Sequence, residues 1–219
     1  MGYTRDNITY NALRWAAQLR IVNTRAQVNK ELCNGCTICE KVCPTLSITV
    51  GKNRLAVVNE LTCTGCGNCE ERCPEYAISL VPIKPKLLQV DWTRAPRERV
   101  FEVCRKAHMH PQEVICYCTG TRAREIAASI LLGARTPEKI SRQTGVRTGC
   151  TVECIEPILR LLAAAGVKLG KAPGYQWYGL TSTAWDLPEE VVKNPEYKKF
   201  YFDEDRRLLD RIAESQGGE

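Results

Sequence analysis

The sequence has no long apolar run. A helix needs about twenty consecutive apolar residues to cross a bilayer, and no such stretch occurs, so we expect no integral membrane segment. The N-terminal stretch MGYTRDNITYNALRWAAQLR also lacks an uninterrupted apolar core, a twin arginine and a cleavage-like site of small residues. We therefore expect a cytoplasmic protein without a signal peptide, whose cysteines bind metal rather than form disulfides.

The short motifs of nucleotide binding and nucleophilic catalysis are missing too. The sequence contains no G-x-G-x-x-G, no P-loop, no G-x-S-x-G and no cysteine–histidine pairing of the kind that activates a nucleophile. These absences leave no site for NAD, FAD or an organic substrate. We therefore predict no catalytic residue in this chain.

Cysteine, in contrast, is abundant, with 13 among 219 residues. Eight of them fall in two runs, CNGCTICEKVCP (33–44) and CTGCGNCEERCP (63–74), which coincide after a shift of thirty residues. An internal repeat of this size indicates two copies of one structural unit related by pseudo-symmetry. The C-x2-C-x2-C part of each run can deliver three thiolates to three irons of a cubane cluster, and the fourth iron then needs a thiolate from elsewhere.

Structural zinc is the alternative for closely spaced cysteines. It prefers two well-separated C-x2-C pairs, which differ from three evenly spaced cysteines with a fourth before a proline. Residues 31–81, with both runs intact, resemble the bacterial two-[4Fe–4S] ferredoxin family, in which the fourth cysteine of each run ligates the other cluster. The resemblance implies one cluster on Cys33, Cys36, Cys39 and Cys73, and a second on Cys63, Cys66, Cys69 and Cys43.

The sequence between and after these runs fits such a domain. The sequence pattern of residues 47–58 predicts a β-hairpin, and that of residues 77–81 predicts a closing strand. A unit of about fifty residues buries little apolar area, so we expect the clusters to supply much of its folding free energy.

A third set of cysteines has a different spacing, C-x-C followed later by C-x3-C. Helix start and stop signals predict three helices around it, from Thr121 to Gly133, from Thr136 to Gly145, and over 152–166 with Pro157 in its first turn. Both cysteine pairs are then expected at helix N-termini, where free N–H groups and the helix dipole favour an anionic ligand.

Residues 114–166 resemble the [2Fe–2S]-binding domain of bacterioferritin-associated ferredoxin in the C-x-C pair and in the stretches TGTRAREI and TGVRTGC. The resemblance implies one [2Fe–2S] cluster held by Cys116, Cys118, Cys150 and Cys154. The family usually ends in C-x2-C, whereas three residues separate Cys150 from Cys154 here. A bulged turn would absorb the extra residue; zinc or an altered cluster is the alternative.

The remaining cysteine and the histidines have simpler interpretations. We expect Cys104 to be a small buried hydrophobic residue, with a replacement ligand as the alternative. His108 and His110 are expected to have capping or surface roles, because four cysteines already suffice for the third cluster.

The formal net charge of +6 would by itself favour nucleic acid as a partner. The count treats every cysteine as neutral, however. Each oxidised cluster core carries roughly +2 against four thiolates, so three clusters add roughly −6 and cancel the excess. We therefore expect no nucleic-acid partner.

Together these features predict an α+β protein: a two-cluster ferredoxin domain of β-hairpins and short helices, followed by a small all-α [2Fe–2S]-binding domain, with docking extensions at both ends. Helical spacing of Ile8, Ala12, Trp15, Leu19 and Val22 predicts an N-terminal amphipathic helix. The expected parts are an extension over 1–30, the ferredoxin-like domain over 31–81, a linker with a helix over 82–113, the [2Fe–2S] domain over 114–168, and an aromatic-rich arm with a terminal helix over 169–219.

The functional expectation follows from three one-electron carriers without a substrate site. We predict an electron-transferring iron–sulfur subunit of a cytoplasmic oxidoreductase, in a hetero-oligomer with a flavoprotein dehydrogenase subunit and exchanging electrons with a partner such as a soluble ferredoxin. Heteromeric amino-acid and hydroxy-acid dehydrogenases have a similar module content, which is a fold-level analogy. The alternative is a cluster scaffold or carrier, or an iron-release partner of a storage protein.

Overall fold

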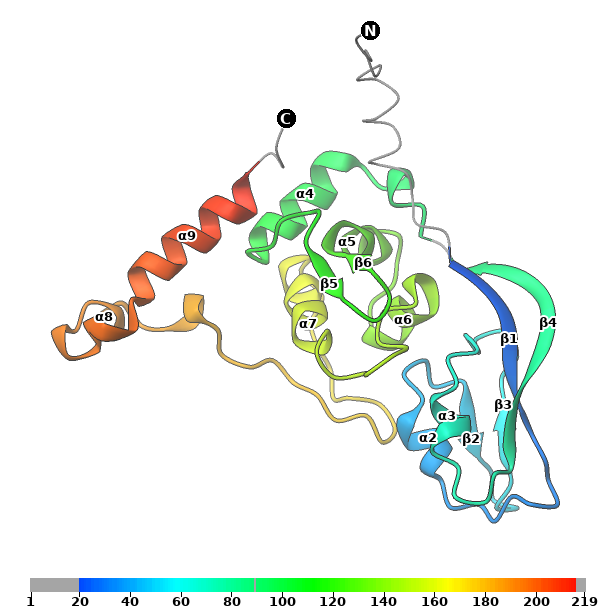
Figure 1. Ribbon diagram of the computed structural model, residues 1–219. Helices are drawn as coiled ribbons and strands as arrows, with labels where there is room; N and C mark the ends of the chain where they lie inside the picture. The colour runs from blue at the N-terminus through cyan, green and yellow to red at the C-terminus, as the bar shows by residue number, and fades with distance from the viewer. Residues whose placement is uncertain (1–19, 89, 216–219) are drawn as a thin grey trace, which may run out of the picture.

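The structure is a computed structural model and describes residues 20–88 and 90–215 (Figure 1). Most of the predicted amphipathic helix over 7–22 lies outside these residues. Its last member, Val22, is buried in strand β1 (Arg20–Val28). The helix prediction is wrong at this end because β1 pairs with a strand distant in the sequence, and such pairing overrides a local helical pattern.

The first part of the chain folds into a small α+β unit. Its elements after β1 are α2 (Ile38–Val42), β2 (Ile48–Val50), β3 (Ala56–Val58), α3 (Asn68–Glu71) and β4 (Ile78–Leu88). β2 and β3 pair antiparallel with Ile48 opposite Val58, which confirms the predicted hairpin. β4 begins within the predicted closing strand and continues well beyond it.

The thirty-residue repeat of the sequence is also a repeat of contacts. Glu40 Oε2 accepts a hydrogen bond from the Val50 N–H at 3.0 Å. In the second copy, Glu70 Oε1 accepts from the Leu80 N–H at 2.9 Å. Each carboxylate thus fastens the short helix of its own run to the strand that follows, and the two runs form two copies of one unit.

The prolines after residue 81 do not form a linker. β4 extends to Leu88 and pairs antiparallel with β1, with Pro82 opposite Thr24 and Pro85 within a register shift. In a two-stranded ribbon each strand has a free edge, where the missing N–H of proline costs no ladder hydrogen bond. The linker prediction is therefore wrong for residues 82–88, and the ribbon extends the unit beyond the predicted 31–81.

The second part of the chain is a helical domain with an apolar core. Its elements are the 3₁₀ helix Trp92–Arg94, α4 (Arg97–Lys106), β5 (Val114–Cys116), β6 (Thr121–Arg122), α5 (Ala123–Leu131), α6 (Pro137–Thr144) and α7 (Ile155–Ala164). The core includes Ile126, Ile140 and Ile158, which are fully buried. Cys104 on α4 is also fully buried there, as predicted for a small hydrophobic residue. This domain was predicted to be all-α, but it also contains the short antiparallel pair β5–β6.

Local capping signals explain both ends of α6 and the start of α5. α6 is capped as predicted, because Thr136 accepts a hydrogen bond from the Lys139 N–H and Gly145 ends the helix with φ 73°. α5 starts later than predicted, since Thr121 belongs to β6 and the Glu125 carboxylate accepts from the Arg122 N–H at 2.6 Å.

The C-terminal arm follows α7. It runs without regular structure to the 3₁₀ helix Ala184–Asp186 and continues through α8 (Glu189–Val192), the 3₁₀ helix Pro195–Phe200 and α9 (Phe202–Glu214). In Figure 1 the arm passes close to α2 before it turns back toward α4. The terminal helix predicted at the end of the arm is confirmed.

The two histidines hold this arm on the helical domain. His108 Nδ1 lies 2.7 Å from Asp210 Oδ1 on α9, and its ring stacks on Trp185 at 4.3 Å between centroids. His110 Nε2 lies 2.7 Å from the Ser215 carbonyl oxygen. Both imidazoles are thus used in contacts with the arm, which agrees with the expected non-ligand role.

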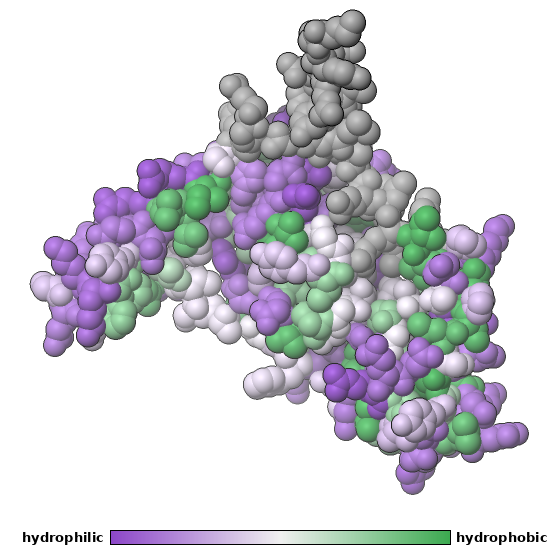
Figure 2. Space-filling model, viewed as in Figure 1, coloured by the Kyte–Doolittle hydropathy of each residue, from purple (hydrophilic) through white to green (hydrophobic). Residues whose placement is uncertain are grey.

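One face of α9 remains apolar and exposed. Leu208, Leu209 and Ile212 are 47%, 40% and 52% exposed. Figure 2 shows hydrophobic surface over this helix. Within residues 20–88 and 90–215, no helix combines the length and apolar character needed to span a bilayer.

Candidate metal centres

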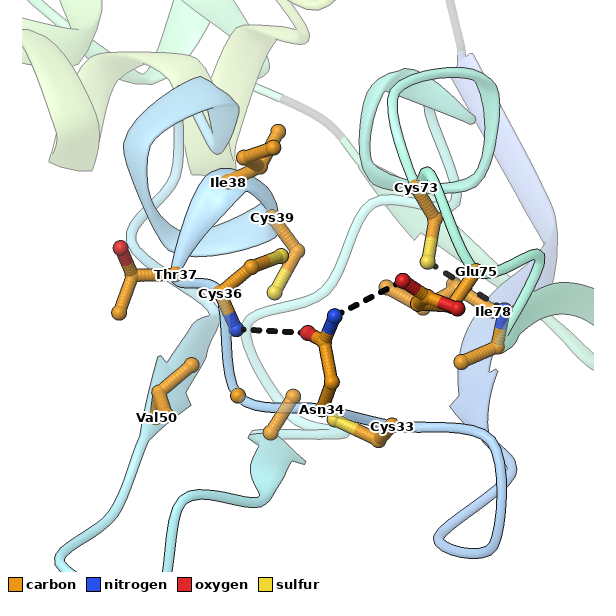
Figure 3. A pocket seen from close by; sticks show the side chains of 13 residues that line it. Cys33, Asn34, Cys36, Thr37, Ile38, Cys39, Val50, Cys73, Glu75 and Ile78 are labelled. Atoms are coloured by element: carbon orange, nitrogen blue, oxygen red, sulfur yellow. Dashed lines mark hydrogen bonds between the residues drawn. The ribbon is translucent and has the colours of Figure 1, made fainter.

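The first candidate centre is a pocket between the two cysteine runs (Figure 3). It encloses about 330 Å³, including its open mouth. Four cysteines line it: Cys33, Cys36, Cys39 and Cys73. The first three come from the first run and the last from the second run, so the structure brings together the same four side chains that were predicted for one cluster.

A hydrogen-bonded pair joins the two runs beside this pocket. The Asn34 side-chain amide donates to Glu75 Oε1 at 2.8 Å, and its carbonyl oxygen accepts from the Cys36 N–H at 3.0 Å. Figure 3 shows both bonds at the edge of the cysteine set. Asn34 therefore helps to hold Cys36, from the first run, near the segment that carries Cys73.

The second candidate centre is the counterpart of the first. Its pocket encloses about 300 Å³ by the same measure. The cysteines that line it are Cys43, Cys63, Cys66 and Cys69. Here the crossing residue is Cys43, from the first run. The structure thus separates the eight cysteines into the two predicted crossed sets, while ligation itself stays a prediction.

Glycine is required once in each run because the backbone passes very close to another segment. A Cβ on Gly35, at φ +73°, would lie 2.3 Å from the Arg54 carbonyl oxygen. A Cβ on Gly65, at φ +61°, would lie 2.4 Å from the Thr24 carbonyl oxygen. The glycine of the C-x-G-C motif in both runs is therefore needed, because only glycine adopts this left-handed conformation without strain and without a clash.

The backbone also donates to sulfur at equivalent places. The Ser47 N–H donates to Cys43 Sγ at 3.2 Å, and the Ala77 N–H donates to Cys73 Sγ at 3.3 Å. Hydrogen bonds of this kind stabilise a thiolate and tune the reduction potential of a cluster that it ligates.

Burial opposes ionisation of the inner cysteines. It raises the pKa of Cys39 to about 11 and that of Cys69 to about 12, with neighbouring cysteines adding to both shifts. Several thiolates around one poorly solvated space need a compensating positive charge, which iron supplies when it displaces the protons. The donor set and its environment therefore fit a cationic iron–sulfur core. Within the described residues, no three His, Cys, Asp or Glu side chains are grouped to hold one single metal ion.

The third cysteine set also comes together in the fold. Cys116 ends β5 and Cys154 caps the start of α7, and both are buried. Cys118 and Cys150 are exposed, and the Cys150 N–H lies 3.5 Å from Cys118 Sγ. The set thus has a buried half and an open half.

The extra residue of the C-x3-C pair is accommodated by an unusual backbone conformation. Thr151 has φ 64°, in the left-handed region. The Val152 and Glu153 N–H groups then point to Cys150 and lower the pKa of its thiol. A turn with one left-handed residue therefore lies between Cys150 and Cys154, and it directs two backbone donors to one sulfur.

Only the second pair lies at a helix N-terminus. Cys154 caps α7, whereas β6 separates Cys118 from the start of α5, so the prediction is wrong for the first pair. Cys154 donates to Cys116, which lowers the pKa of Cys116 to about 5, although burial opposes this shift. The same bond and burial raise the pKa of Cys154. Thiolate character is thus favoured at Cys116 even inside the fold.

The comparisons with known proteins agree with this division of the chain. Residues 32–78 match the family model of a 4Fe-4S dicluster domain. Residues 114–164 match the model of a BFD-like [2Fe-2S] binding domain. A search among curated proteins found no match. Both resemblances inferred from the motifs are confirmed, and the α+β chain contains two kinds of iron–sulfur-binding domain, which implies electron transfer or cluster binding.

Proposed function

We propose that the chain is the electron-transferring iron–sulfur subunit of a multi-subunit oxidoreductase. It relays single electrons between a flavoprotein partner and a second donor or acceptor through two [4Fe–4S] clusters and one [2Fe–2S] cluster. The observation that carries the proposal is the arrangement of twelve cysteines in three sets of four. Two sets line separate pockets, and the third lies in another domain.

Each set is proposed to hold one cluster. The [4Fe–4S] ligands would be Cys33, Cys36, Cys39 and Cys73 at the first site, and Cys63, Cys66, Cys69 and Cys43 at the second. The [2Fe–2S] ligands would be Cys116, Cys118, Cys150 and Cys154. Iron–sulfur clusters supply one-electron redox chemistry when bound, and the protein supplies the thiolates, their spacing and their hydrogen bonds.

The exposure of the cysteines supports a relay with two open ends. Cys36 is exposed at the first site, and Cys118 and Cys150 are exposed at the third. Cys43 and Cys69, at the second site, are both buried. An external partner can therefore approach the first and third sites more closely than the second.

A flavoprotein fits this relay because a flavin exchanges two electrons with its substrate and can pass them on singly. The sequence has no dinucleotide-binding motif of its own, so the two-electron chemistry belongs to another subunit. The exposed apolar face of α9 offers a surface for a hetero-oligomer. The proposed complex is cytoplasmic, because cysteines that serve as metal ligands rather than as disulfides are typical of a reducing compartment.

Anaerobic purification from the native host tests this proposal. We expect about ten irons per chain, eight in two cubanes and two in the binuclear centre, and co-purification of a flavin-containing subunit that reduces the clusters. An iron count near eight together with zinc would overturn the [2Fe–2S] assignment. A colourless protein with no paramagnetic signal after dithionite would overturn the whole proposal.

The open half of the third site favours a second candidate, a [2Fe–2S] scaffold or iron-release partner. Exposed Cys118 and Cys150 would allow an acceptor protein to attack the cluster. A scaffold transfers its cluster to an apo-acceptor within minutes, whereas a relay keeps its cluster and cycles reversibly between two oxidation states. Incubation with an apo-ferredoxin, followed by iron analysis of both proteins, separates the two functions.

A further inference from the structure

The two cluster-binding domains meet at the segment that carries Cys43. Arg142 Nε, on α6 of the helical domain, donates to the Thr45 carbonyl oxygen at 2.8 Å. The Thr45 hydroxyl lies 3.4 Å from Cys43 Sγ, and Thr45 is only 1% exposed. The helical domain therefore contacts the first domain beside a cysteine of the second site.

A residue of the C-terminal arm strengthens this contact. The Gln176 side-chain N–H₂ lies 3.3 Å from the carbonyl oxygens of both Lys41 and Cys43 and donates to them. Its side-chain oxygen accepts from the Arg147 guanidinium at 2.9 Å. The preceding Tyr175 lies under Lys41 Nζ at 5.1 Å from the ring centroid. Gln176 is thus bonded to both domains at once.

Arg147 connects Gln176 to the third site. Its backbone continues through Thr148 and Gly149 to Cys150, and a Cβ on Gly149 would lie 2.7 Å from Cys118 Sγ. Its guanidinium is 4% exposed and lies 3.4 Å from Glu138 Oε1. The Tyr178 hydroxyl donates to the same carboxylate at 2.8 Å. Arg147 is therefore held rigidly, with its backbone at one site and its side chain directed to the other.

We propose that Gln176 and Arg147 form the electron-transfer bridge between the second [4Fe–4S] site and the [2Fe–2S] site. The bridge runs from Cys43 through the Gln176 amide and the Arg147 side chain, and then along the backbone from Arg147 to Cys150. This inference rests on the proposed relay function. It also assigns the order of the sites, with the crossed set that contains Cys43 in the middle.

The step involves one electron and no bond cleavage. With clusters bound, the [4Fe–4S] centre would be oxidised by one electron as the [2Fe–2S] centre is reduced by one, or the reverse, and the step would need no proton transfer. The bridge acts by positioning and coupling, because continuous covalent and hydrogen-bonded contacts replace gaps that an electron would otherwise cross through space.

Rapid one-electron reduction of the holoprotein by a flash-activated photoreductant tests the bridge. Gln176→Leu keeps the approximate size of the side chain but removes both hydrogen-bonding ends. We expect the electron exchange between the two centres to slow by about ten- to a hundredfold, the order of effect that small misplacements have on positioned reactions. Iron content and the separate low-temperature paramagnetic spectra should remain those of the wild type.

Two further variants sharpen the test. Gln27→Leu makes the same chemical change at an exposed position of β1 and should exchange electrons at the wild-type rate. Gln176→Glu keeps an acceptor for Arg147 but cannot donate to the Cys43 and Lys41 carbonyls, so it should also be slow. If Gln176→Leu loses iron, the exchange rate of Gln176→Glu tests the bridge in its place.

Pulsed dipolar spectroscopy on the reduced protein provides a readout independent of activity. A slow Gln176 variant supports the bridge in either case. An unchanged distance between the two centres would show that coupling is lost, and an increased distance would show that positioning is lost. Wild-type exchange rates in the iron-loaded Gln176 variants would overturn the bridge. Absence of exchange in the iron-loaded wild type would instead overturn the relay.

Discussion

The two cluster-binding domains are stabilised by different kinds of core. Among the residues that the structure describes, four of the eight in the buried core of the first domain are cysteines, namely Cys39, Cys43, Cys63 and Cys69. In the buried core of the helical domain, three of the 23 described residues are cysteines, and the rest are mainly aliphatic. Apolar burial stabilises a fold without a cofactor, whereas a core built of metal ligands depends on the metal. We therefore expect the folding of the first domain to depend on bound clusters, and that of the helical domain to depend on its cluster only near the four cysteines.

Iron removal is expected to produce the largest difference between the two domains. After chelation under reducing conditions, residues 20–88 should lose their amide protection, because burial in a unit of this size cannot offset its chain entropy. Helices α4 to α7 should keep their protection. Hydrogen exchange with mass spectrometry measures both domains in one sample. Equal loss, or equal retention, in the two domains would contradict the contrast.

Replacement of a crossing cysteine should affect one site of the first domain. Cys43→Ser should disturb the cluster of the second pocket, held by the 63–69 run, with loss or conversion of up to four irons. The matched variant Cys73→Ser should disturb the first pocket instead. Iron analysis and low-temperature paramagnetic spectra distinguish the two. Damage confined to the 33–39 cluster in Cys43→Ser would refute crossed ligation.

A buried ion pair offers a way to weaken the helical domain without touching a cysteine. Glu138→Ala leaves the Arg147 guanidinium buried without its carboxylate partner. We expect the free energy of unfolding of this domain to fall by about 3–5 kcal/mol. Glu190→Ala, at an exposed position of α8, should change it by less than about 0.5 kcal/mol. Anaerobic urea unfolding followed by circular dichroism measures both, and similar values would contradict the assigned role of the pair.

The smallest expected effect concerns the cysteine that is not assigned to a cluster. Cys104→Ser should destabilise the helical domain by about 1–3 kcal/mol, because it buries a hydroxyl in an apolar core. Cys104→Ala serves as the apolar comparison. Iron content should stay at the wild-type value in both variants, whose thermal unfolding can be compared directly. Loss of iron would assign Cys104 a ligand role, contrary to its place on α4.

Local signals were sufficient for much of the first domain and its candidate sites. The repeated runs, with glycine between the first two cysteines, specify two equivalent loops, and the structure places the cysteines in the predicted crossed groups. Thr136 and Gly145 likewise predicted the ends of α6, because capping depends on neighbouring residues alone. For the third set, the C-x3-C spacing predicted a bulged turn, and the structure shows that Thr151 adopts a left-handed conformation there.

Other features depended on contacts between distant segments. The first residues of β1 (20–22) were predicted as part of a helix and the end of β4 as a linker, because neither stretch shows locally that the other will supply its backbone partner. The position of Gln176 between Cys43 and Arg147 has no sequence motif either. The sequence by itself thus determined the chemistry of the cysteine sets and the ends of α6, which short-range spacing encodes. Only the tertiary structure decided how the domains meet and which residues lie between their sites, since those contacts arise from the packing of the whole chain.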